Sequence, residues 1–551
     1  MSSEQITALL AQARDWAAQD PDQQTRDELV AAIAAVEAGG DGTALADAFR
    51  GTLEFGTAGL RGALGAGPNR MNRVVVIRAA AGLVAYLKSQ GATAEDAVVI
   101  GYDARHNSEV FARDTAEVVA GAGLRALLLP RHLPTPVLAF AIRDLGAVAG
   151  VMVTASHNPP QDNGYKVYLG DGSQIVPPAD VEIATRIAAI GALESVPRLN
   201  EVTVLGDDVV EHYLDAVAGL AGEGPRDLRL VYTPLHGVGN DVALEVLRRA
   251  GFAAPHVVTT QRDPDPDFPT VAFPNPEEPG AMDAALALAA EVDADLVLAN
   301  DPDADRCAAA VRGPHGWQML RGDEVGALLG SYLLRKGRSG TYAASIVSSS
   351  LLGKLATAHG QEYVETLTGF KWIGRLPGLA FGYEEALGYC VDPNHVKDKD
   401  GVSALLLLSL LAAEAKADGK TLIDLLDEIA REHGLHATDQ LSVRVTDLTQ
   451  ISRAMARLRE NPPTELADLA VVTAEDLSLG TADLPPTDGL RYQLDGGARV
   501  IVRPSGTEPK IKCYLEVAVA VEPDGDVDAA RISAAGRLDA LRDGIKQAAG
   551  L

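Results

Sequence analysis

The chain has 551 residues, 47% of them hydrophobic and 23% charged, which is the ordinary balance of a globular protein with roughly three to four domains. Its formal net charge of −28 at pH 7 argues against nucleic acid or an anionic membrane surface as a partner. An anionic substrate would therefore have to be bound by a few local basic residues.

The three cysteines, Cys307, Cys390 and Cys513, lie far apart and predict neither a zinc site nor a disulfide framework. The N-terminal segment is acidic and amphipathic, unlike a signal peptide. The longest apolar run, at 404–413, is too short to span a bilayer. We therefore expect a cytoplasmic protein without a membrane partner. The sequence does not indicate its oligomeric state.

Roughly the first 40 residues have a helical pattern. A unit then recurs in which an apolar run rich in β-branched residues ends in a polar turn, and a helical pattern follows. Its instances are 97–105, 151–159, 229–237, 296–306 and, more weakly, 342–350. Alternating strands and helices predict parallel α/β sheets, in which ligands bind beyond the carboxyl ends of the strands.

Linker-like composition divides the chain into four predicted domains, which span 1–205, 206–318, 319–435 and 436–551. The last of them has several prolines and two strand-like runs around a tight loop at 499–519, so we expect it to be α+β rather than doubly wound.

Two of the turns bring polar groups to glycine- or proline-rich loops. In FGTAGLRG (55–62) a loop backbone could approach a ligand closely, and Arg61 could bind a phosphate. In TASHNPP (154–160) Ser156 follows a core strand and is held by prolines. This arrangement fits either a strand-end cap or a nucleophile. Ser156 and His157 do not form a hydrolase triad, because adjacent residues on a strand point opposite ways.

Asp301, Asp303 and Asp305 alternate in DPDADR, directly after a core strand. In an extended segment these residues share one face, where three carboxylates would repel one another. A hard divalent cation such as Mg²⁺ removes that repulsion, which favours a metal site over a solvated acidic turn. An EF-hand is excluded, because Arg306 and Arg312 replace its glycine and glutamate. An aspartyl-phosphate phosphatase remains an alternative.

Two further stretches contain groups that could bind a hydroxyl or a phosphate. The acids of GYEEALG (382–388) could accept hydrogen bonds from sugar hydroxyls, although this stretch alone is a weak indication. RPSGTEPK (503–510) places an arginine and two hydroxyls on a tight turn, which favours a phosphate cradle over an ordinary turn.

Taken together, TASHNP, DPDADR, GYEEALG and RPSGTEPK resemble the phosphoserine, metal, sugar-binding and phosphate-binding loops of the α-D-phosphohexomutase superfamily. The strings SHNPPQDNGYKVY, TLTGFKWIG and KDKDGV look most like its phosphoglucomutase-2 and phosphopentomutase branch. The resemblance runs from about Gly51 to the end of the chain. It implies four domains around a central cleft: three related mixed α/β domains and a smaller C-terminal α+β domain.

The resemblance also implies roles for individual residues. Ser156 carries a phosphoryl group and, with Asp301, Asp303 and Asp305, holds one Mg²⁺ per chain. The other implied catalytic residues are His157, Lys166, Arg61 and Lys399, and the implied substrate-binding residues are Arg306, Thr368, Gly369, Lys371, Glu384, Glu385, Arg503, Ser505, Gly506 and Thr507. One position departs from the pattern, because Ala386 stands where many members have a serine.

The implied reaction moves a phosphoryl group between C1 and C6 of glucose or mannose phosphates, with a sugar 1,6-bisphosphate as intermediate and activator. The alternatives are a phosphopentomutase or a glucose-1,6-bisphosphate synthase and, in a different class, a Mg²⁺-dependent sugar-phosphate phosphatase with Asp301 as nucleophile. The physiological sugar does not follow from the sequence, nor does the choice between His157 and Lys399 as general base.

Overall fold

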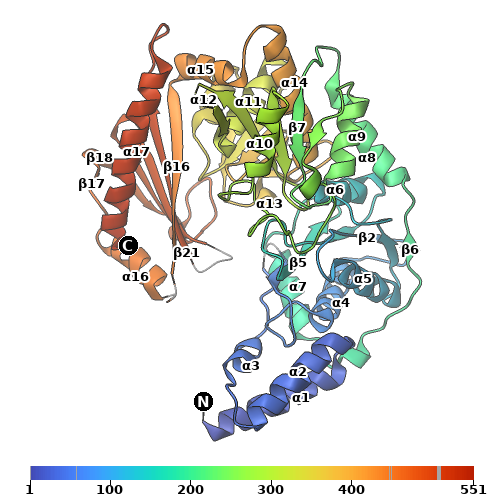
Figure 1. Ribbon diagram of the computed structural model, residues 1–551. Coiled ribbons are helices and arrows are strands. Elements are labelled where there is room, and N and C mark those ends of the chain that lie inside the picture. Colours follow the sequence, from blue (N-terminus) through green and yellow to red (C-terminus); the bar gives the residue numbers. More distant parts are fainter. Residues whose placement is uncertain (1, 57–58, 315, 446, 448, 506–509) are drawn as a thin grey trace. The chain divides into compact units, whose positions relative to one another are not determined.

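The computed structural model describes residues 2–56, 59–314, 316–445, 447, 449–505 and 510–551. The chain folds as two compact units. Their helices and strands are labelled in Figure 1. Unit 1 contains residues 1–319 and 388–413, and unit 2 contains residues 320–387 and 414–551. No helix among the described residues is long and apolar enough to cross a membrane.

The first sheet of unit 1 has the strand order β1-β5-β4-β2-β3-β6. Strands β2, β3, β4 and β6 are parallel, whereas β5 runs antiparallel to β4 and β1 antiparallel to β5. The strands are β1 (Leu60–Ala63), β2 (Ala97–Tyr102), β3 (Arg125–Leu128), β4 (Ala149–Val153), β5 (Asp162–Leu169) and β6 (Thr203–Val204). Both β2 and β4 are buried along their whole length, as parallel strands between helices are.

Helices cover both faces of this sheet. Val98 and Ile100 pack with α5, whereas the next residue, Gly101, faces Leu138 of α6 on the other side. The helices are α4 (Arg73–Ser89), α5 (Ser108–Gly121), α6 (Thr135–Asp144) and α7 (Ala179–Ala188). The N-terminal helices form a separate apolar cluster with α4; they are α1 (Ser3–Gln19), α2 (Gln23–Glu37) and α3 (Thr43–Ala48).

The second sheet of unit 1 has the order β11-β10-β9-β7-β8. Strands β7, β8 and β9 are parallel, and β10 turns back antiparallel to β9. The strands are β7 (Leu230–Thr233), β8 (His256–Val257), β9 (Leu296–Asn300), β10 (Cys307–Gly313) and β11 (Gly316–Met319), and the helices are α8 (Asp208–Ala218), α9 (Asn240–Arg249) and α10 (Asp283–Glu291). The later segment of unit 1 contains β15 (Gly388–Cys390) and the start of α14 (Gly401–Ala417).

Unit 2 contains one parallel and one antiparallel sheet. In the first, β12 (Thr341–Ser345) lies between β13 (Glu362–Thr366) and β14 (Leu379–Glu384), with helices α11 (Gly322–Arg335), α12 (Leu351–Ala358), α13 (Phe370–Ile373) and α15 (Leu422–His433). The second has the order β16-β21-β20-β19-β18-β17 and packs against α16 (Thr449–Glu460) and α17 (Val527–Ala549).

The strands of the antiparallel sheet are β16 (Leu435–Arg444), β17 (Glu465–Leu466), β18 (Leu469–Asp476), β19 (Leu490–Leu494), β20 (Arg499–Pro504) and β21 (Lys510–Val519). Short 3₁₀ turns complete the chain at Leu193–Ser195, Gly219–Ala221, Thr259–Gln261, Leu477–Leu479 and Asp495–Gly497. Three mixed α/β sheets and a C-terminal antiparallel sheet confirm the predicted fold class.

A buried polar network joins the two sheets of unit 2. Glu516 on β21 accepts hydrogen bonds from the Ser349 hydroxyl (2.7 Å) and the Ser350 amide (2.9 Å), and forms an ion pair with Arg499 (2.8 Å). His436 lies 3.0 Å from the same carboxylate. Burial raises the pKa of Glu516, but Arg499 and His436 outweigh burial and lower that pKa to about 2.

This pKa shift predicts a pH dependence. Because an unfolded glutamate titrates near pH ~4.3, ionised Glu516 stabilises the fold fully above that pH, and its contribution disappears as the pH falls towards 2. Glu516→Gln should lower the free energy of unfolding at pH 7 by about 3 kcal/mol. In urea titrations this deficit should shrink between about pH 4.5 and pH 3.

The matched control is Glu522→Gln, which changes an exposed glutamate of the same domain. A Glu516→Gln deficit that stays constant down to pH 3 would contradict the assignment.

Candidate active site

Ser156 lies in a loop of two turns, residues 154–161, between β4 and β5. Its backbone has φ +54°, a left-handed conformation that costs a non-glycine residue of order 1–3 kcal/mol. The Ser156 amide donates to the hydroxyl of Thr154 (2.9 Å), and the buried Ser156 hydroxyl donates to Asp301 Oδ2 (2.9 Å). The side chain therefore points at Asp301 and does not cap the end of the strand.

His157 differs from expectation. Because Ser156 lies in a turn and not on the strand, the two neighbouring side chains do not point apart, and His157 Nδ1 lies 3.3 Å from Ser156 Oγ. Burial lowers the pKa of His157 well below its ordinary value, and Arg306 and Arg61 lower it further. The imidazole is therefore neutral at pH 7.

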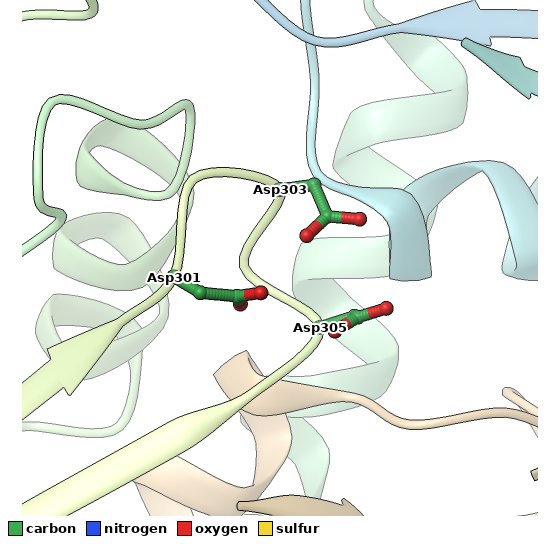
Figure 2. A group of neighbouring side chains, drawn as sticks. All are labelled: Asp301, Asp303 and Asp305. Atoms are coloured by element: carbon green, nitrogen blue, oxygen red, sulfur yellow. The ribbon is translucent and has the colours of Figure 1, made fainter. Parts of the chain in front are cut away.

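The three aspartates occupy the loop between β9 and β10 (Figure 2). They are fully buried, and one carboxylate oxygen of each lies within 4.8 Å of the others. They converge for a reason that the sequence argument missed. The segment is not extended but forms a tight turn, in which Ala304 has φ +53° and its amide bonds Asp301 O (2.8 Å).

Basic side chains offset part of this negative charge. Lys166 Nζ lies 2.7 Å from Asp303 and 2.8 Å from Asp305, and Lys399 Nζ lies 3.4 Å from Asp305. Arg306 Nε is 3.8 Å from Asp301 and from Asp305. The three carboxylates are not compensated equally, because, within the residues that the structure describes, Asp305 has three basic neighbours and Asp301 has only Arg306.

The uneven compensation appears in the pKa values. Burial raises the pKa of Asp301 well above its usual range, and the charges of Asp303 and Asp305 raise it further. Burial also opposes ionisation of Asp303 and Asp305, but Lys166 more than offsets it and lowers both pKa values.

The donor set fits a hard divalent cation. Among the described residues, Oδ1 of Asp303 and Oδ1 of Asp305 are buried without a hydrogen-bond partner, which is costly for a carboxylate oxygen. Three carboxylates close together are the oxygen ligands that Mg²⁺ or Ca²⁺ prefers. The group could therefore hold one such ion.

The Lys399 loop is anchored within unit 1 although it follows the sugar-loop motif in sequence. Asp398 accepts hydrogen bonds from the Tyr168 hydroxyl (2.8 Å) and the Gln174 amide (2.7 Å), and Asp400 accepts one from the Tyr213 hydroxyl (2.8 Å). These contacts place Lys399 beside the aspartates.

Two residues near these groups were not identified from the sequence. Thr135 at the start of α6 donates its hydroxyl to Asp303 Oδ2 (2.6 Å), and its amide bonds Asp303 O (2.9 Å). Arg105 lies under the Ser156 loop. Arg105 ends one of the recurring strand-and-turn units at 97–105, which was the available signal. Arg61 also reaches this loop, donating to Asn158 Oδ1 (3.1 Å).

The remaining predicted residues lie in unit 2. The Gly369 amide donates to Glu384 Oε1 (2.7 Å), whereas Glu385 Oε2 lies 3.3 Å from the hydroxyls of Ser345 and Ser348. Thr368 is half-buried just before α13, and Lys371 Nζ lies 5.5 Å from the centre of the Trp372 ring.

Tyr514 on β21 is close enough to the acids of the sugar loop and to Arg503 of the predicted phosphate cradle for their charges to change its pKa. Burial and the charges of Glu385 and Glu384 raise the pKa of its phenol, and Arg503 acts in the opposite direction. Arg503 and Ser505 are both half-buried, and the Ser505 amide bonds Lys510 O (2.8 Å). Gly506 and Thr507 lie outside the described residues.

Four consecutive segments match the domains of one protein family. Residues 52–194, 211–316 and 321–433 match the α/β/α domains I, II and III of the phosphoglucomutase/phosphomannomutase family, and residues 442–525 match its C-terminal domain.

Curated relatives agree with this match. The chain is 51% identical over 454 residues to a probable phosphomannomutase of Haemophilus influenzae, a match that covers 81% of this chain and 93% of the relative. It is 35% identical to a probable phosphoribomutase of Schizosaccharomyces pombe (91% and 92% covered) and 36% identical to a phosphoglucomutase of Staphylococcus aureus (89% and 93%).

The crystal structure of a candidate phosphomannomutase from Thermus thermophilus is 27% identical, with a TM-score of 0.69 over 90% of this chain and 98% of that one.

The buried carboxylates predict stabilisation by Mg²⁺. At a concentration of 100 times its Kd, the ion should add about 2.7 kcal/mol to the free energy of unfolding. Calorimetric unfolding scans with and without MgCl₂ should show this shift in the wild type and lose it in the double variant Asp303→Asn, Asp305→Asn. The exposed variant Asp263→Asn should keep the shift. An equal shift in the double variant would place the ion elsewhere.

Proposed function

The chain belongs to the phosphoglucomutase/phosphomannomutase family and is a phosphosugar mutase, an isomerase; we propose that it moves a phosphoryl group between C1 and C6 of mannose or glucose monophosphates. In this proposal Ser156 carries the phosphoryl group and a sugar 1,6-bisphosphate is the intermediate. The observation that carries it is the buried Ser156 hydroxyl, 2.9 Å from Asp301 and surrounded by carboxylates and basic groups.

We assign Ser156, Asp301, Asp303 and Asp305 as the residues that hold one Mg²⁺. When bound, Mg²⁺ neutralises charge on the phosphoryl group, which is most of what phosphoryl transfer requires of its catalyst. Oδ1 of Asp303 and Oδ1 of Asp305, which have no hydrogen-bond partner in the described part of the chain, support this assignment.

The basic residues of unit 1 have distinct parts in the proposal. Arg61 and Arg306 bind the oxygens of the transferring phosphate, because a guanidinium matches phosphate oxygens in pairs. Lys166 is assigned as a phosphate contact whose ammonium group lies on Asp303 and Asp305 before substrate binds. His157 Nδ1 lies 3.3 Å from Ser156 Oγ, so we assign its neutral imidazole as the acceptor of the proton of the attacking sugar hydroxyl. Burial lowers the pKa of Lys399, but Asp305 and Asp398 outweigh burial and raise it, so we assign the charged ammonium group as a phosphate contact or proton donor.

Residues of unit 2 bind the part of the substrate that does not react. Glu385 is held by two serine hydroxyls, so we assign Glu384 as the main acceptor for sugar hydroxyls, supported by Thr368, Gly369 and Lys371. Arg503 and Ser505, together with Gly506 and Thr507 of the same loop, would bind the distal phosphate.

Turnover has two half-reactions in this scheme. Phosphorylated Ser156 donates its phosphoryl group to the free hydroxyl of a sugar monophosphate. The hydroxyl proton passes to the neutral imidazole of His157 and from there to Ser156 Oγ, the oxygen that the phosphoryl group leaves. The sugar bisphosphate then returns its other phosphoryl group to Ser156. Added bisphosphate should therefore act as an activator, because it phosphorylates enzyme molecules that have lost the group.

A pentose phosphate is the second candidate substrate. It is favoured by the relative named a probable phosphoribomutase, which matches over 548 residues. In addition, Ala386 stands where many members of the superfamily have a serine, so the sugar loop lacks that hydroxyl. The same residues could also synthesise a sugar 1,6-bisphosphate as the net product.

A substrate panel tests the proposed sugar. Turnover of mannose 1-phosphate, glucose 1-phosphate and ribose 1-phosphate is measured with Mg²⁺ and the matching bisphosphate as activator. We expect kcat/KM to be highest for one of the two hexoses, since the relative with the highest of the quoted identities is named a phosphomannomutase. A much higher kcat/KM for ribose 1-phosphate would replace the hexose assignment with the pentose one.

A labelling experiment tests the proposed carrier. After incubation with the bisphosphate, intact-mass measurement and peptide mapping should find one phosphate on Ser156. Ser156→Ala should lose this phosphate and reduce turnover below detection, whereas Ser195→Ala, an exposed serine of the same domain, should change neither. Phosphate on Asp301, accompanied by release of inorganic phosphate, would instead establish the phosphatase alternative.

A further inference from the structure

One buried side chain, Arg105, forms hydrogen bonds to the main chain of the Ser156 loop. Its Nη2 donates to the carbonyl oxygens of Ser156 (2.7 Å) and Asn158 (2.5 Å), and its Nη1 donates to those of Pro159 (2.9 Å) and Asp162 (3.2 Å). A single guanidinium thus binds four main-chain carbonyls within seven residues, from 156 to 162.

The loop needs such a donor. The buried carbonyl of Ser156 must be hydrogen-bonded, and the carbonyls of Asn158, Pro159 and Asp162 are partly shielded from solvent. The two prolines at 159 and 160 remove two of the amides that could bond these groups from within the loop. In addition, Ser156 is held at φ +54°, a strained conformation that persists only where the surroundings impose it. Arg105 binds the carbonyl of this same strained residue.

Arg105 is itself fixed before any substrate arrives. Its side chain is 1% exposed, and Nε lies 3.4 Å from Asp103 Oδ2. The other oxygen of Asp103 accepts hydrogen bonds from the Arg105 amide (3.0 Å) and the Ser108 hydroxyl (2.6 Å). The ring of Phe268, from the second sheet's domain, lies 4.9 Å from the guanidinium carbon. The donor fork therefore has one orientation.

We infer that Arg105 is a positioning residue for phosphoryl transfer, which sets the direction of the Ser156 hydroxyl by binding the main chain of its loop. This inference rests on the proposed role of Ser156. Arg105 acts through the loop, and the lengths of its four hydrogen bonds leave the guanidinium on the main-chain side of Ser156. A lysine cannot replace it, because an ammonium group lacks the planar fork that spans four acceptors.

The inference is tested with Arg105→Lys and Arg105→Ala. We expect kcat per folded molecule to fall about 10²-fold in Arg105→Lys, the cost of misplacing a reacting group by about 1 Å, while KM for the sugar phosphate changes little. The rate at which bisphosphate phosphorylates Ser156 should fall by a similar factor. In Arg105→Ala, added guanidinium ion at non-denaturing concentration should restore part of the lost kcat.

The matched control is Arg73→Lys. Arg73 also forms a largely buried ion pair in the first domain, with two 2.7 Å bonds to Asp114, but it joins α4 to α5. Arg73→Lys should lower the unfolding temperature while leaving kcat per folded molecule and the response to guanidinium unchanged. Hydrogen exchange should accelerate selectively in peptides covering 154–164 for the Arg105 variants and not for Arg73→Lys.

Two results would overturn the inference: a kcat of Arg105→Lys equal to that of Arg73→Lys, or unchanged hydrogen exchange in the loop. If Arg105→Ala fails to fold, Arg105→Lys and the exchange measurement still decide. A wild-type enzyme without phosphate on Ser156 would instead refute the proposed function, so the two failures can be told apart.

Discussion

Three buried carboxylates on one turn are the constraint on which unit 1 depends. Because they are packed together and buried, they can remain charged only beside cations. Two of these cations come from distant parts of the chain, Lys166 on β5 and Lys399 after β15, whereas the third, Arg306, directly follows Asp305. The mutual repulsion of the aspartates is thus reduced by basic residues that other elements of unit 1 place beside them. The antiparallel β5 is the element that brings Lys166 within reach.

The Ser156 loop is subject to a second constraint. Its carbonyl groups need hydrogen-bond donors, as the aspartates need cations. Arg105 supplies donors to the loop, and Lys166 supplies charge to the aspartates. The Ser156 hydroxyl is the point where the two arrangements meet, since its main chain belongs to the first and its side chain bonds Asp301 of the second. The strained backbone of Ser156 is tolerated because Arg105 binds its carbonyl and Asp301 binds its hydroxyl.

The sequence predicts the fold class and the meeting of the three aspartates, because residue types carry that information: alternating strands and helices, and three aspartates after a core strand. It does not predict how the groups meet. The aspartates converge through a turn at Ala304 instead of an extended face, and Thr135 and Arg105 matter only because of partners 168 and about 51–57 residues away in the chain. Such long-range contacts leave no local pattern in the sequence. The predicted roles of Gly506 and Thr507 stay predictions, because both residues lie outside the described part of the chain.

The division of the chain has a consequence for how this protein could be taken apart. The chain passes between the two units three times, after residues 319, 387 and 413, so the unit that contains the aspartates is not one contiguous gene segment. A fragment ending at Met319 would keep Ser156 and all three aspartates but would lose Lys399 and the acceptors of the Tyr168 and Tyr213 hydroxyls. Recombination at the apparent domain borders would therefore separate Lys399 from the aspartate that it contacts, and would separate two buried tyrosines from their hydrogen-bond acceptors. Exchanging single domains between relatives would break these contacts.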